Sequence, residues 1–143
     1  MTEPQEVAES AAEAMWARDR ASQALGMEIV DVGPGRAVVR MTVREDMVNG
    51  HAIGHDGLTF TLADSAFAFA CNSYDRRTVA AGAEIRFRAP THLGDVLTAT
   101  ATERSREGRS GVYDVEVTAS GPGGVTVVAT FVGHSREIGG SFA

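Results

Sequence analysis

NGHAIGHDGLTFTLADSAFAFACNSY, residues Asn49–Tyr74, is the stretch that decides the fold. Its first residues include several glycines, and small and apolar residues then continue for about four helical turns. The apolar positions leave no solvated side on such a helix; they are Leu58, Phe60, Leu62, Ala63, Ala66, Phe67, Ala68, Phe69, Ala70 and Cys71. A helix that is apolar all round is a buried helix. Asp64 lies in its middle, and because an unpaired ionised carboxylate is costly there, we expect it to be hydrogen-bonded, shifted in pKa or used in chemistry.

The flanking segments predict one helix before this stretch and strands on both sides of it. Pro4 to Leu25 is rich in alanine, begins with a proline and ends at Gly26, which predicts a surface helix. From Met27 to Val43 the hydrophobic period changes to two around Gly33-Pro34-Gly35, which predicts a hairpin. Four more strand-like runs follow the buried helix: three that alternate, Ala83–Arg88, Val96–Thr102 and Tyr113–Thr118, and one that is mostly apolar, Val125–Val132.

This order of elements predicts an α+β fold, with an antiparallel sheet of about six strands wrapped around a long central helix. We expect a single domain over residues 1–143, with the first helix within 1–25 and a loose tail over 135–143. One sheet covers only one face of a helix, so a helix buried on every side needs another cover. A second copy of the chain is the simplest cover, which predicts a homodimer.

Composition narrows the classes of partner. The net charge of −6 argues against binding nucleic acid or an anionic membrane through bulk charge. No apolar stretch is long enough to span a bilayer, and the acidic first 20 residues do not resemble a secretory signal. The single cysteine, Cys71, lies in the apolar run, which indicates a reduced compartment. We therefore expect a cytoplasmic protein.

Several motifs resemble one enzyme family. Asn49-Gly50, His55-Asp56-Gly57 and Leu62-Ala63-Asp64 occur in order, followed by an Ala/Phe-rich run. Phe87-Arg88-Ala89-Pro90 and Gly94-Asp95-Val96 come later. Over roughly residues 26–132 the chain resembles the hotdog-fold acyl-coenzyme A thioesterases of the phenylacetate pathway (PaaI type).

The resemblance implies the hotdog fold and hydrolysis of aryl-acetyl thioesters, such as phenylacetyl- or hydroxyphenylacetyl-coenzyme A. Coenzyme A is then part of the substrate, and no separate cofactor is implied. The resemblance also implies homodimers whose sheets join edge to edge, usually paired into homotetramers, with sites between protomers. In that arrangement Asp64 of one chain faces Asn49 and the His55 turn of its partner. The family has His-Gly-Gly where this chain has Asp56 after the histidine.

Thioester hydrolysis needs a nucleophile or base and a donor for the developing oxyanion. Asp64 either attacks the carbonyl to give a mixed anhydride or deprotonates a water molecule; its alternative is a structural carboxylate bonded to a neighbouring element. The oxyanion donor is expected at the N-terminus of the central helix, from the N–H of Asp56 or Gly57. We expect Asp56 to act as the N-cap of that helix, and to slow turnover by placing a carboxylate beside the oxyanion.

The remaining candidates have ordinary structural alternatives. Asn49 is expected to hold the water or the Asp64 carboxylate, or else to form a turn with Gly50. His51 and His55 are four apart, but no third ligand is evident, so no metal site is predicted. Five arginines are expected to form a basic rim for the coenzyme A phosphates, or else to be a solvated strand face; they are Arg86, Arg88, Arg104, Arg106 and Arg109.

Three functions follow from these residues. The first is a thioesterase that acts on aryl-acetyl or medium acyl groups. The second is an acyl-coenzyme A binding protein that is weakly catalytic because of Asp56. The third, a hotdog dehydratase or hydratase, needs a histidine with an acidic partner on the helix, and the sequence shows none.

Overall fold

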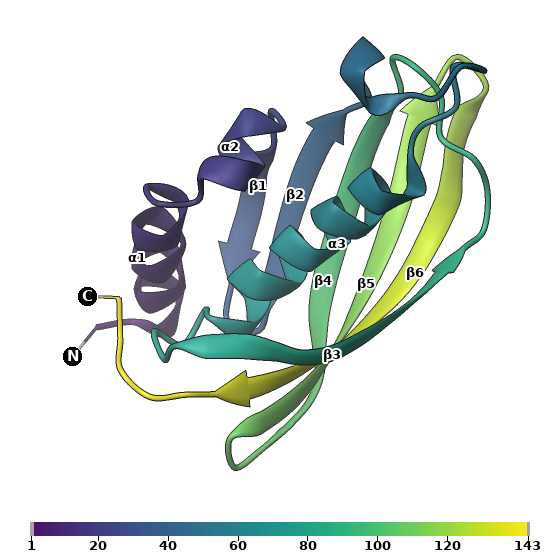
Figure 1. Ribbon diagram of the computed structural model, residues 1–143. Coiled ribbons are helices and arrows are strands. Elements are labelled where there is room, and N and C mark those ends of the chain that lie inside the picture. Colours follow the sequence, from purple (N-terminus) through teal and green to yellow (C-terminus); the bar gives the residue numbers. More distant parts are fainter. Residues whose placement is uncertain (1, 143) are drawn as a thin grey trace.

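A six-stranded antiparallel sheet wraps around one long helix in the computed structural model, which describes residues 2–142 (Figure 1). The order of strands across the sheet is β1-β2-β4-β5-β6-β3. The strands are β1 Glu28–Gly33, β2 Arg36–Thr42, β3 Thr78–Phe87, β4 Val96–Glu107, β5 Ser110–Gly121 and β6 Gly124–Glu137. The helices are α1 Pro4–Trp16, α2 Arg20–Ala24, the single turn η1 Glu45–Met47 and α3 Asp56–Cys71. The α+β, hotdog-type architecture predicted from the sequence is confirmed.

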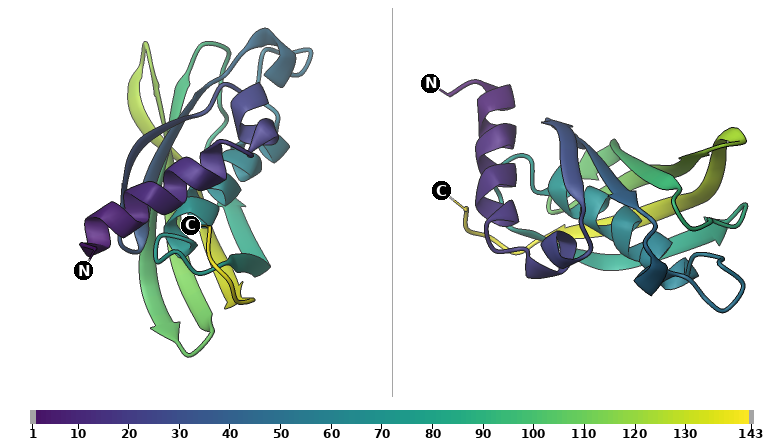
Figure 2. Two further views of the ribbon diagram at one scale, coloured as in Figure 1. Left: turned by 90° about the vertical axis from the view of Figure 1, so that its left-hand side faces the viewer. Right: turned by 90° about the horizontal axis from the view of Figure 1, so that it is seen from above.

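The sheet curves around α3, α1 packs beside β1, and α2 leads from α1 to the side of α3, where Ser22 contacts Ser65 (Figure 2). Its strands alternate in burial because successive side chains point to opposite faces. On β5, Tyr113, Val115 and Val117 point inward and are at most 2% exposed. None of the helices in residues 2–142 has the length and apolar character that crossing a bilayer requires.

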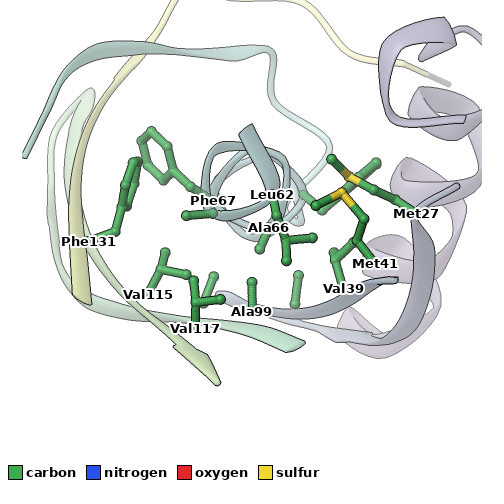
Figure 3. Close-up of a cluster of buried hydrophobic side chains, with 14 of the residues drawn as sticks. Met27, Val39, Met41, Leu62, Ala66, Phe67, Ala99, Val115, Val117 and Phe131 are labelled. Atoms are coloured by element: carbon green, nitrogen blue, oxygen red, sulfur yellow. The ribbon is translucent and has the colours of Figure 1, made fainter. Parts of the chain in front are cut away.

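The core lies between α3 and the sheet, as Figure 3 shows with α3 seen end-on. Three fully buried alanines on the helix meet a sheet surface that is also lined by alanines, so the helix axis can approach closely. Larger side chains fill the two flanks, with Met27 and Met41 on one side and Phe67 and Phe131 on the other (Figure 3). Burying side chains of this size contributes about 1.5–3 kcal/mol each.

Side-chain hydrogen bonds define both ends of α3. At its C-terminus Asn72 donates from Nδ2 to the carbonyls of Ala68 and Thr78, and its Oδ1 accepts from the N–H of Thr78. Asn72 therefore ends α3 and starts β3, the strand at one edge of the sheet.

Two boundaries predicted from the sequence are wrong. The helix expected from Pro4 to Leu25 is two helices, because Asp19 caps α2 and interrupts the chain after Trp16. The tail expected to be loose from residue 135 is bound: residues 135–137 belong to β6. Beyond them Ile138 donates to the carbonyl of Arg77, and Phe142 donates to Asp75. Residue 143 lies outside the described residues.

Candidate active site

The N-terminus of α3 is capped by a histidine rather than by Asp56. The N–H of Gly57 donates to His55 Nδ1 at 3.0 Å, while the backbone of His55 is held by Met47 and Leu58. Asp56 is the first helical residue, and its side chain is exposed. The expectation that Asp56 caps α3 is therefore wrong. Because Nδ1 accepts, a neutral His55 carries its proton on Nε2, where it remains a donor.

Two glycines make this cap possible. A Cβ on Gly57 would lie 3.0 Å from His55 Nδ1, so a side chain there would displace the imidazole. A Cβ on Gly54 would lie 1.9 Å from Thr91 Oγ1, and the N–H of Gly54 donates to the Thr91 carbonyl at 2.8 Å. The loop before α3 is thereby fastened to the segment that follows β3.

The oxyanion candidates are now distinguishable. The N–H of Gly57 is already bonded to His55. The first four N–H groups of a helix have no intrahelical acceptor, and within residues 2–142 nothing bonds to the N–H of Asp56. The Asp56 N–H is therefore the donor that this helix end presents to an anion.

Asp64 lies on the side of α3 that the sheet does not cover. It is half-buried, as are Thr61, Ser65 and Ala68 on the same side. Its pKa is raised above the ordinary aspartate value, mainly because burial desolvates the carboxylate and secondarily because Asp19 is a nearby like charge. Within residues 2–142 its carboxylate makes no hydrogen bond or ion pair. The structural alternative, a carboxylate bonded to a neighbouring element, therefore does not hold within one chain.

The spacing along α3 separates the two halves of the expected catalytic apparatus. Asp56 and Asp64 are eight residues apart, which at 1.5 Å per residue is about 12 Å along the axis. An attacking group and an oxyanion donor must both lie about 3 Å from one thioester carbonyl. The Asp56 N–H and the Asp64 carboxylate of one chain are therefore too far apart to serve the same carbonyl.

Two residues that sequence reasoning assigned no chemical role lie beside this face. Asp19 caps α2, and Ser22 is the buried residue of that short helix. Ser22 Oγ lies 2.8 Å from Ser65 Oγ, directly after Asp64 in the chain. The local sequence holds no signal for this contact, because it joins residues 43 positions apart.

Asn49 shapes the loop that precedes α3. Its side-chain oxygen accepts from the N–H groups of His51 and Ile53, at 2.9 and 3.2 Å. Its backbone also bonds to Ile53 and Ala52. Within one chain Asn49 thus has the turn-forming role; the residue is exposed, and its side-chain NH₂ group makes no hydrogen bond within residues 2–142.

The five arginines do not form one rim on a single chain. Arg86 pairs with Thr130 in the sheet, and Arg88 bonds to the side chain of Thr130. The other three lie toward the β4–β5 hairpin. Arg104 lies three to four residues along β6 from Thr130, and Arg106 and Arg109 lie five or more residues away, or about 17 Å at 3.3 Å per residue. Arg104 is paired with Asp114, Arg106 lies 3.6 Å over the ring of Tyr74, and Arg109 lines a small pocket with Arg106.

The fold is that of the hotdog class, and its central helix carries a carboxylate and an N–H that have no partner within residues 2–142. Residues 51–126 match the profile of the thioesterase superfamily, and the chain belongs to that family. It is an enzyme, a thioester hydrolase.

The relatives agree with this assignment. The chain is 45% identical over 130 residues to the acyl-coenzyme A thioesterase PaaI of Escherichia coli, covering 91% of each chain. It is 39% identical over 113 residues to a putative esterase of Deinococcus radiodurans, covering 78% of this chain and 75% of that one. Among solved structures, that of the E. coli PaaI protein from the phenylacetic acid degradation operon superposes with a TM-score of 0.92 at 42% identity, covering 97% and 99%.

Proposed function

We propose that the chain hydrolyses acyl-coenzyme A thioesters, preferably aryl-acetyl ones, at sites shared by two copies of the chain. One observation carries the proposal: Asp64 is a half-buried carboxylate with a raised pKa and no hydrogen-bond or ion-pair partner among residues 2–142 of its own chain. A group in that state is a competent base or nucleophile. The aryl-acetyl preference rests on the resemblance to PaaI.

In the proposed site, Asp64 of one copy and the Asp56 N–H of the other act on one carbonyl. Asp64 either attacks the thioester carbon or takes a proton from a water molecule that attacks it. The oxyanion that forms is stabilised by the Asp56 N–H at the positive end of α3. Collapse breaks the carbon–sulfur bond. Where Asp64 is the base, the proton that it took from water passes to the thiolate of coenzyme A. Where Asp64 is the nucleophile, a water molecule then hydrolyses the anhydride, which frees the acid and Asp64 and supplies the proton for the thiolate. His55 Nε2–H and the Asn49 NH₂ group are the further donors of the same turn.

Two surfaces support a homodimer in which such sites form. β3 is a ten-residue edge strand that pairs only with β6, and nearly all of its residues are exposed. Long unpaired edges invite pairing with another strand, and Val79 and Phe87 on β3 are 45% and 46% exposed. The uncovered side of α3 is the second surface. We propose that β3 edges join two copies and that two dimers form the tetramer, in the cytosol, where Cys71 stays reduced.

The first test is a turnover panel on wild type and Asp64→Asn. Thiol release is followed for phenylacetyl-, hydroxyphenylacetyl- and straight-chain acyl-coenzyme A. We expect the aryl-acetyl thioesters to have the highest kcat/KM, and Asp64→Asn to lose about 10²–10⁴-fold. Asp64→Asn with wild-type turnover would refute the proposal. In a single turnover in ¹⁸O-labelled water, label recovered on Asp64 identifies the mixed anhydride, because water that attacks its aspartyl carbon leaves an oxygen there, whereas the base role puts the label only in the released acid.

The second test asks whether the site is shared. Asp56→Pro removes the N–H at a first-turn position that tolerates proline, and the extended His55 before it suits a following proline. We expect Asp56→Pro and Asp64→Asn each to be nearly inactive alone. After dissociation and mixing, half the dimers are mixed and one of their two sites is intact, so about a quarter of wild-type activity should return. No recovery in dimers shown to have exchanged would place both groups in one chain.

The arginines receive a separate test. Arg88→Ala and Arg106→Ala are compared on acyl-coenzyme A and on the acyl-pantetheine analogue, which lacks the nucleotide phosphates. If an arginine binds phosphate, we expect its replacement by alanine to raise KM for the coenzyme A thioester alone. The expected rise is about 10-fold, which corresponds to the loss of one charged hydrogen bond. Equal KM changes for both substrates would assign that arginine a structural role.

A further inference from the structure

A chain of three polar side chains runs from α2 to the residue after Asp64. Asp19 accepts the backbone N–H of Ser22 on Oδ1 at 3.0 Å and the hydroxyl of Ser22 on Oδ2 at 2.7 Å. Ser22 Oγ lies 2.8 Å from Ser65 Oγ. Ser22, in the middle, is 2% exposed, and Asp19 and Ser65 on either side of it are half-buried.

The number of protons available fixes the direction of these hydrogen bonds. A serine hydroxyl has one proton to donate, and a carboxylate only accepts. Ser22 gives its proton to Asp19, so between the two serines Ser65 must be the donor. With its own proton committed, Ser65 Oγ can only accept a hydrogen bond from anything that binds beside Asp64.

We infer that Asp19 and Ser22 are positioning residues that hold Ser65 as a hydrogen-bond acceptor for the hydrolytic water. This inference rests on the proposed function, in the form in which Asp64 is the base. A water bound between Asp64 and Ser65 then gives one proton to each acceptor and turns a lone pair toward the carbonyl. As its oxygen bonds to the thioester carbon, Asp64 takes one proton, and the other stays on the attacking oxygen, bonded to Ser65. The carbon–sulfur bond then breaks, and the proton on Asp64 passes to the sulfur.

Asp19→Asn tests this inference, because it reverses the direction of the hydrogen bonds from residue 19 to Ser65 while keeping the helix cap. Asparagine caps helices as well as aspartate does, and its single oxygen must face the N–H of Ser22. Its NH₂ group then donates to Ser22 Oγ, Ser22 donates to Ser65, and the Ser65 proton is turned toward the water. Ser22→Ala removes the hydrogen-bonded link between Asp19 and Ser65 without changing the net charge. Glu45→Gln, an exposed residue of η1, is the control for losing one negative charge.

We expect Asp19→Asn and Ser22→Ala to lower kcat about 10- to 100-fold on the alkaline plateau of the pH profile, as small misplacements of reacting groups do. KM and the melting temperature should stay near wild type, and Glu45→Gln should be unchanged. In a Ser65→Ala background, Ser22→Ala should have no further effect on kcat, because the residue through which Ser22 acts is gone and no charge near Asp64 changes.

Wild-type kcat for Asp19→Asn, or an undiminished loss in the Ser65→Ala background, would overturn the inference. Neither result touches the proposed function, which stands or falls on Asp64→Asn.

Discussion

Gly133 on β6 is the position where one added methyl group should disturb the core most sharply. A Cβ there would lie 2.7, 2.7 and 2.8 Å from three ring carbons of Phe67. Carbon atoms pack best at about 3.5–4.0 Å, so the ring would have to move by about 1 Å. Phe67 is 1% exposed and packs against the rings of Tyr113 and Phe131, with centroids 5.7 and 5.8 Å away. The ring has no free space to enter.

We therefore expect Gly133→Ala to destabilise the fold by about 2–3 kcal/mol, in the upper part of the range for overpacked cores. For a chain of this length that is a fall in melting temperature of about 4–12 °C. Gly133 has no positive φ, so packing rather than backbone strain is the cause. Urea unfolding at fixed protein concentration measures the change, since binding between copies makes stability depend on concentration.

Two further variants make the reasoning refutable. At Gly82→Ala on β3 the nearest atom to the new Cβ is a ring carbon of His134 at 4.0 Å, an ordinary contact, so this control should change stability by less than about 0.5 kcal/mol. Phe67→Leu/Gly133→Ala should be more stable than the two single changes predict when added, because the shorter side chain makes room for the methyl group. Additive losses, or Gly133→Ala as stable as Gly82→Ala, would show that the ring is not confined by its neighbours.

Three further expectations concern the site. The pKa of Asp64 is raised in the folded protein, so kcat/KM should fall on the acidic side at a pH above the ordinary aspartate range, and a limb at that ordinary value would contradict the burial. Because the Asp64 pKa is higher in the folded than in the unfolded chain, Asp64 favours the folded state at low pH, and this stability is lost as the pH rises through the folded-state pKa. Asp64→Asn should therefore have a higher melting temperature than wild type at neutral pH, and the difference between the two melting temperatures should vanish in acid. Asp56→Gly should raise kcat several-fold by removing a carboxylate from beside the oxyanion, and an unchanged kcat would make that charge neutral to catalysis. Burial raises the pKa of the Cys71 thiol to about 12, so thiol reagents at pH 7.5 should label it only in unfolding concentrations of urea, and rapid labelling of the native protein would be evidence against its 5% exposure.

Periodicity in the sequence was sufficient for the sheet and for the central helix, because burial acts on every second residue of a strand and on the whole length of α3. It failed at the chain ends. Residues 135–137 offer little apolar surface and read as a tail, yet all three pair with β3, and Ser135 and Arg136 also pair with β5 on the other side. Their hydrogen bonds are contributed by strands distant in sequence, which local composition does not report.

The helix ends show a similar limit. Asp56 is a better N-cap than histidine by propensity, so the sequence favoured it. His55 is the N-cap in the structure because Gly57 leaves room for the imidazole and Gly54 lets the loop pack against Thr91. Likewise Asp19 resembles any exposed acid in an alanine-rich helix until its bonds to Ser22 are seen.

Asp64 was predictable from sequence because it is the only acid in the apolar run, and the helix phase explains why it stands where it does. Ala63 and Ala66 are fully buried against the sheet, so a carboxylate at either place would lose its water without gaining an acceptor or a substrate. One residue on from Ala63, a rotation of 100° brings Asp64 to the uncovered side. The same helix carries its anion-binding end about 12 Å away. In the proposed function, one chain thus carries the base at one place and the oxyanion donor at another, and a second copy that runs past the first brings the two to a single carbonyl.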